Sequence, residues 1–67
     1  MKKTYDLVFS DETAENSKGW KESIEYCKEY IRENNGTEFS YFEDYKGGTV
    51  SVMCNETGET VYTEVVK

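Results

Sequence analysis

The sequence of 67 residues contains no histidine and only two cysteines, Cys27 and Cys54. Without histidine, the chain cannot build a Ser-His-Asp or Cys-His nucleophilic site, or a zinc or haem site with histidine ligands. Two cysteines that are far from a C-x-x-C spacing cannot form a Cys₄ zinc site. A catalytic role would therefore rest on carboxylates, tyrosines, lysines or the cysteines. Paired carboxylates need a deep cleft, which 67 residues around one helix do not easily build, so we expect no metal, no other cofactor and no catalytic site.

Basic residues and long apolar runs are also scarce. Eight Lys and Arg stand against 14 Asp and Glu, so the net charge is −6. This balance opposes binding to nucleic acid phosphates and to an anionic membrane surface. No apolar run approaches the roughly 18 residues of a membrane span, and Leu7-Val8-Phe9 is too short for the core of a signal peptide. These features favour a cytoplasmic protein of bacterial or phage origin, with a secreted fragment that has lost its signal peptide as the alternative.

The length predicts a single small domain over residues 1–67. The hydrophobic share of 36% is low for a folded chain. Ten aromatic residues offset this, because each one brings a large area to a small core. We expect a folded domain whose stability is a few kcal/mol.

The pattern of apolar residues changes along the chain. Residues 4–10 alternate with a period of two, which is typical of a strand. Residues 11–18 are polar and predict a loop, with Ser17 as the cap of the helix that follows. Residues 18–34 predict an amphipathic helix that ends at Asn35-Gly36, because their apolar positions recur with helical spacing.

The remaining segments predict three strands, at 37–45, 49–54 and 59–66, joined by turns at 46–48 and 55–58. The expected fold is therefore α+β, with the order β-α-β-β-β and one helix on one face of a four-stranded mixed sheet. With the strands numbered along the chain, we prefer the sheet order 2-3-4-1, which places 4–10 beside 59–66. The alternative is 1-2-3-4.

The predicted core consists of the apolar residues that share the inner faces of these elements. They are Tyr5, Leu7, Phe9, Trp20, Ile24, Cys27, Ile31, Val50, Val52, Cys54, Val61 and Val65. Strand 37–45 is ambiguous, because either Phe39, Tyr41 and Tyr45 or Phe42 alone faces the helix. Cys27 and Cys54 either pair as a disulfide or remain two buried thiols.

The leading functional hypothesis concerns the sheet face that a single helix leaves uncovered. We expect an aromatic and apolar patch there, typical of a surface that binds another protein or a second copy of the chain. Its members are Tyr41, Phe42, Met53, Tyr62 and Val66. The chain is then a small non-enzymatic protein-interaction module, unless the patch only stabilises the sheet through cross-strand contacts.

The alternative hypothesis concerns a row of carboxylates on the predicted helix. Glu22, Glu25, Glu29 and Glu33 lie within about 80° of one another around the helix axis. They could imitate the phosphates of nucleic acid and inhibit a protein that binds it, or simply form a solvated helix face. Residues 11–22 resemble a calcium loop only in their acids, because Asn16 replaces the glycine that the turn requires.

Overall fold

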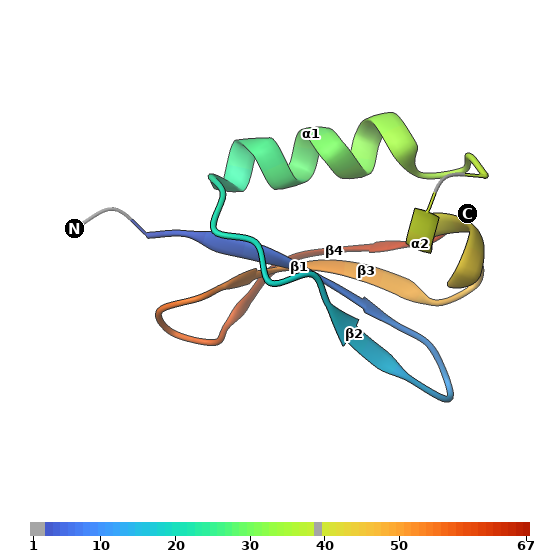
Figure 1. Cartoon of the computed structure of the whole chain (residues 1–67), viewed down its shortest axis with the longest axis horizontal. Helices are drawn as coiled ribbons and strands as arrows, with labels where there is room; N and C mark the ends of the chain where they lie inside the picture. The colour runs from blue at the N-terminus through green and yellow to red at the C-terminus, as the bar shows by residue number, and fades with distance from the viewer. Residues whose placement is uncertain (1–2, 39) are drawn as a thin grey trace.

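The computed structural model describes residues 3–38 and 40–67 and shows an α+β fold. A helix lies along one side of an antiparallel sheet, and a second, short helix lies at one end (Figure 1). The elements are β1 (Tyr5–Ser10), β2 (Glu15–Ser17), α1 (Ile24–Asn34), α2 (Ser40–Asp44), β3 (Thr49–Cys54) and β4 (Thr60–Val65). The strands predicted at 4–10, 49–54 and 59–66 correspond to β1, β3 and β4.

The sheet has the order β2-β1-β3-β4, and all its pairs are antiparallel. The predicted mixed sheet, in which 4–10 lies beside 59–66, is therefore wrong, and so is the alternative order. Both orders required 37–45 to pair with 49–54 as a strand. Because that segment is not a strand in the structure, β3 has a free edge, which β1 occupies with Leu7 opposite Val52.

The predicted loop at 11–18 contains β2, which forms a hairpin with β1. The Asp11 carboxylate shapes the turn, since its Oδ1 accepts hydrogen bonds from the backbone N–H groups of Thr13 and Ala14 at 2.8 and 2.9 Å. These bonds hold the pKa of Asp11 below its ordinary value. The three residues of β2 are all polar and exposed, so no alternation of apolar residues marks the strand.

Helix α1 begins later than the predicted residue 18. The backbone of Glu22 pairs with that of Tyr5 through two hydrogen bonds of 2.8 and 3.1 Å, which keeps the preceding segment extended along β1. Ser23 is the N-cap, and its hydroxyl accepts a hydrogen bond from the N–H of Tyr26 at 3.1 Å. The predicted end is confirmed, because Asn35 is the C-cap and Gly36 follows with a φ of 89°.

The position of the cap leads to a stability prediction. Ser23→Ala should lower the free energy of unfolding by about 1 kcal/mol, because it removes the acceptor for an N–H of the first turn. Ser17→Ala should have almost no effect, since Ser17 lies exposed in β2. Urea denaturation followed by circular dichroism compares the two variants. A larger loss from Ser17→Ala would place the helix start where the sequence pattern first predicted it.

The segment predicted as a strand at 37–45 contains α2. Phe42 follows Tyr41 by one position in the chain, and Tyr45 follows Tyr41 by four. A single helical turn can therefore direct all three side chains toward the core. The ring of Phe42 packs edge-on against that of Phe9, with 5.0 Å between their centres. The rings of Tyr41 and Tyr45 lie 5.4 and 5.8 Å from the ring of Phe9. Phe39, the other residue predicted to face the helix from this segment, lies outside the described residues.

The core lies between α1, α2 and the sheet, with α1 in contact with β1 and β3. Its buried members are Leu7, Phe9, Cys27, Ile31, Phe42, Tyr45, Val50, Val52, Cys54 and Val66. Tyr5, Trp20 and Ile24 pack against this cluster but are only partly buried. The predicted core is thus largely confirmed for β1, α1 and β3.

The prediction for the last strand is wrong, because Val61 and Val65 are exposed. The pairing of β4 with β3 shifts by one residue between Val52 and Met53, which is a β-bulge. On the C-terminal side of this shift in β4, Tyr62 lies opposite Val52 and takes the helix-facing position. A slip of one residue moves every following side chain to the other face of a strand.

Candidate functional site

The five residues predicted to form a patch on the open sheet face do not lie together. Phe42 and Val66 are buried in the core, and Tyr41 packs beside Phe9 from α2. Tyr62 faces the helix, where the Nζ of Lys28 lies 5.0 Å from the centre of its ring. Met53 alone of the five lines the open face. The sequence interpretation failed here because α2 and the shifted register of β4 carry the aromatic residues to the other side.

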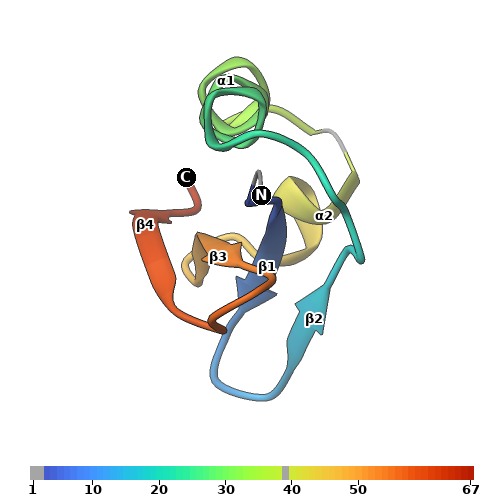
Figure 2. The ribbon, with the colours of Figure 1, turned by 90° about the vertical axis from the view of Figure 1, so that its left-hand side faces the viewer.

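The open face of the sheet is concave and rich in hydroxyl groups instead. Figure 2 shows the strands curving around it on the side opposite α1. A hollow of about 370 Å³ lies there, and the hydroxyls of Ser51 and Thr63 are hydrogen-bonded to each other at 3.2 Å. The lining residues are Val8, Ser10, Glu15, Ser17, Thr49, Ser51, Met53 and Thr60. The face therefore lacks the aromatic area that a protein-binding patch usually presents.

The predicted row of carboxylates is only partly on one helix. Glu25, Glu29 and Glu33 project from α1 and are exposed, whereas Glu22 lies before the cap and its backbone pairs with β1. Arg32 forms a hydrogen-bonded ion pair with Glu29, which lowers the pKa of that carboxylate. The structure thus leaves three carboxylates in the row, one of them neutralised by a neighbour.

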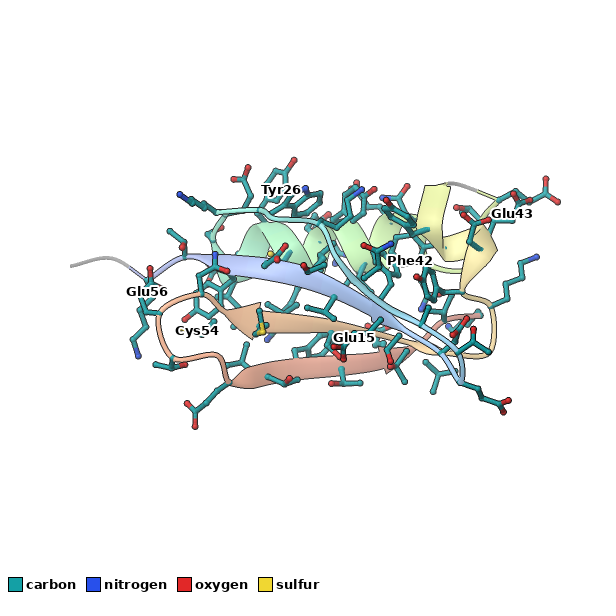
Figure 3. All side chains as sticks on the ribbon, turned by 60° about the horizontal axis from the view of Figure 1, so that its bottom comes forward. Glu15, Tyr26, Phe42, Glu43, Cys54 and Glu56 are labelled. Atoms are coloured by element: carbon teal, nitrogen blue, oxygen red, sulfur yellow. The ribbon has the colours of Figure 1, made fainter. Side chains whose placement is uncertain are left out.

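A different group of aromatic residues lies along the flank of the molecule. We call it the aromatic side, and it consists of Trp20, Tyr26, Tyr30 and Tyr41. The ring of Trp20 makes edge-on contacts with Tyr30 at 4.8 Å and with Tyr26 at 5.6 Å. Tyr26 is 51% exposed, and the other three are partly exposed. In Figure 3, Tyr26 extends away from the sheet, whereas Phe42, a residue of α2, points inward.

A cation already rests on this surface. The Nζ of Lys18 lies 4.5 Å from the ring centre of Tyr41 and 5.8 Å from that of Trp20. Both distances are within the range in which a ring face attracts a positive charge. The aromatic side can therefore hold cationic groups as well as apolar ones.

The backbone of Trp20 is fixed from two directions. The buried carboxylate of Asp6 accepts a hydrogen bond from the N–H of Trp20 at 2.8 Å, and the side-chain amide of Asn55 donates one to its carbonyl at 2.8 Å. Gly19 precedes it with a φ of 76°, a conformation that glycine adopts without strain. The indole is thus held in place by β1 and by the turn after β3.

Tyr30 connects the aromatic side to the core, because its ring lies 5.8 Å from that of Phe42. Burial raises the pKa of its hydroxyl, and the neighbouring Tyr26 adds to this shift. The sequence pattern contained part of this surface, since Tyr30 flanks the apolar stripe of the helix. It gave no indication that Trp20 lies outside the helix, or that Tyr41 lies on the same side.

The two cysteines are both free thiols in the structure, so the disulfide alternative is not realised. Burial raises the pKa of Cys27 to about 11, with a further contribution from the carboxylates of Asp6 and Glu22. The pKa of Cys54 is lowered, because the hydroxyl and backbone N–H of Thr57 can donate hydrogen bonds to its thiolate. Cys54 is nevertheless 2% exposed, so reagents reach it only when the neighbouring turn opens.

Comparison with protein families, with curated proteins and with solved structures finds no match. Within residues 3–38 and 40–67, no cluster of three or more His, Cys, Asp or Glu is arranged to hold a metal ion. Neither of the two helices in this part of the chain has the length and apolar character to cross a bilayer.

Proposed function

We propose that this chain is a small non-enzymatic protein-interaction module and that the aromatic side is its contact surface. The observation that carries the proposal is the packing of Trp20 between Tyr26 and Tyr30, which leaves Tyr26 half exposed on a rigid base. Trp and Tyr dominate the energetics of protein interfaces, because they bury a large area with few rotatable bonds. The non-enzymatic part of the proposal is supported by the absence of histidine from the sequence and by the small size of the chain, which leaves little room for the deep cleft that a carboxylate-based enzyme needs.

The partner that fits this surface carries Arg or Lys side chains. Glu25, Glu29 and Glu33 form the exposed row of α1 next to Tyr26, with Glu33 about 20° from Tyr26 around the helix axis. The net charge of −6 attracts a basic surface at long range. Guanidinium groups also stack on aromatic rings more readily than ammonium groups do. Charge and ring chemistry thus favour the same kind of partner.

Selection from a displayed library of random peptides tests this proposal. The wild-type chain should enrich basic sequences that contain arginine. The variant Tyr26→Ser should bind the selected peptides about 30-fold more weakly, which corresponds to the loss of an interface residue worth about 2 kcal/mol. Tyr26 is half exposed, so the variant should fold normally.

The matched control is Ala14→Ser, which changes an exposed apolar side chain in the turn between β1 and β2, outside the aromatic side. It should bind the selected peptides as the wild-type chain does. Enrichment of acidic or uncharged peptides, or equal binding by Tyr26→Ser, would overturn the proposal.

Mimicry of nucleic acid is the alternative that the same experiment separates. It depends on the carboxylates of α1 and not on the aromatic rings. It predicts that exchanging Glu25, Glu29 and Glu33 together for glutamine abolishes binding, while Tyr26→Ser leaves binding unchanged. It also predicts a steeper dependence on salt than aromatic contacts produce.

A further inference from the structure

Strand β4 forms one border of the sheet, and no strand lies beyond it in the described part of the chain (Figure 2). The other border, β2, is only three residues long and begins with Glu15. Proteins usually protect an exposed edge by short length, lysine, proline or a covering segment. Strand β4 has six residues and contains neither lysine nor proline.

The exposed side chains of β4 are unusual for this molecule. Three large hydrophobic residues are exposed among those that the structure describes, and two of them are Val61 at 44% and Val65 at 64%. Glu64 is the one charged residue of the strand, and it lies opposite Val50 on the helix side. There it accepts hydrogen bonds from the Tyr62 hydroxyl and from the Asn35 amide. The outer face of β4 therefore carries β-branched, uncharged side chains.

The C-cap of α1 covers one end of this edge. The Nδ2 of Asn35 donates to the carbonyl of Val65 at 3.0 Å, and its Oδ1 accepts from the N–H of Lys67 at 2.8 Å. Asn35 thus binds β4 as a residue of a neighbouring strand would. These contacts show that the Val65 carbonyl faces away from β3. The backbone N–H and carbonyl groups of successive residues point to alternate sides of a strand. Those of Thr63, two residues before Val65, therefore also face outward.

We propose that a second copy of this chain pairs with β4 in antiparallel orientation, with the two-fold axis at Thr63. In this register Thr63 lies opposite the partner's Thr63, and Val61 lies opposite the partner's Val65. On the helix side, Tyr62 lies opposite the partner's Glu64. Every pair is apolar with apolar, hydroxyl with hydroxyl, or phenol with carboxylate, and each type stabilises a sheet. The strand is therefore complementary to itself, as a symmetric dimer requires.

The same register leaves the contact with Asn35 intact. The register is centred at Thr63, whose outward backbone groups can form hydrogen bonds with those of the partner's Thr63. The carbonyl of Val65 can stay bound to Asn35, while its N–H remains available to the partner. The dimer joins two four-stranded sheets into one continuous sheet. It leaves the aromatic side of each copy exposed, so it adds to the proposed function without depending on it.

Charge gives the dimer a distinctive dependence on salt. Each copy has a net charge of −6, so the two copies repel each other at low ionic strength. Salt screens this repulsion, whereas the apolar and backbone contacts of β4 are insensitive to it. Self-association should therefore strengthen as salt is added.

Light scattering on the full chain, over a wide dilution series at low and high salt, tests the proposal. The wild-type chain should move from 7.8 kDa to twice that mass as its concentration rises. Thr63→Lys places two like charges at the axis and should raise the dissociation constant at least about tenfold, a change of 1.4 kcal/mol. Asn16→Lys adds the same charge to β2 and should leave the dimer intact.

Cross-linking gives a second measurement that does not rely on the lysine variant folding. Thr63→Cys should form a disulfide-linked dimer under mild oxidation, because the axis brings the two thiols together. Ser17→Cys, on β2, should form no disulfide-linked dimer. A wild-type mass of 7.8 kDa at the highest concentration in high salt would overturn the proposal. So would a dimer that Thr63→Lys leaves unchanged, or a cross-link at Ser17 in place of Thr63.

Discussion

Phe42→Ala is expected to be strongly destabilising and to remove a large part of the free energy of unfolding. Phe42 is completely buried, and its ring lies 5.0 Å from Phe9 and 5.8 Å from Tyr30. Removing a buried phenylalanine ring costs about 3–5 kcal/mol, because both the transfer energy and the packing around the ring are lost. A chain of 67 residues has a total stability of only roughly 3–10 kcal/mol. The substitution therefore removes a large part of what holds the fold together.

Urea denaturation followed by tryptophan fluorescence measures this effect, because Trp20 is the single tryptophan and contacts Tyr30. Phe42→Leu retains most of the volume and should cost less than about 1.5 kcal/mol. Tyr26→Ala, at an exposed aromatic position, should cost less than about 1 kcal/mol. If Phe42→Ala were no more harmful than Tyr26→Ala, then α2 would not pack against the sheet as described.

The same ring shows what the sequence pattern could not decide. Tyr41, Phe42 and Tyr45 fit one face of a helical turn, yet they also fit the two faces of an aromatic-rich strand. The choice depends on Phe9, which lies more than 30 residues earlier in the chain and meets all three rings. The conformation of a short segment is decided by such long-range packing. Strands β1 and β3 could be predicted because their alternation of apolar and polar residues is local and sustained.

Polar segments also carry structure that the pattern of apolar residues does not predict. Strand β2 contains no apolar residue, and it exists because the Asp11 turn and the N–H of Lys18 return the chain to β1. The same return keeps Trp20 and Glu22 extended, although their spacing matches the helix that follows. For this reason Glu22 does not belong to the predicted acidic row, and Trp20 belongs to an aromatic side that helical spacing does not predict. Helical spacing predicts a shared face only when the residues belong to the same helix.

Gly48→Ala is the second substitution with a large expected effect, and its cause is steric. A Cβ at this position would lie 2.2 Å from the carbonyl oxygen of Ser10 and 3.1 Å from the Cβ of Asp11. The oxygen belongs to the backbone of β1, where Ser10 pairs with Thr49, so it cannot rotate away. The end of β1 must shift instead. We expect a loss of about 3 kcal/mol, at the upper end of the usual cost of overpacking.

The adjacent glycine is a matched control with a different requirement. Gly47 has a φ of 87°, and a Cβ there would have no neighbour within 4 Å. Asparagine adopts this left-handed conformation more readily than most other residues, so Gly47→Asn should cost only about 1 kcal/mol. The urea midpoints of Gly48→Ala and Gly47→Asn show whether each position requires glycine for lack of space or for its backbone conformation. Equal losses would mean that β1 does not pass as close to the turn as the structure has it. The expected contrast would show that close approach of β1, and not flexibility of the turn, requires glycine at position 48.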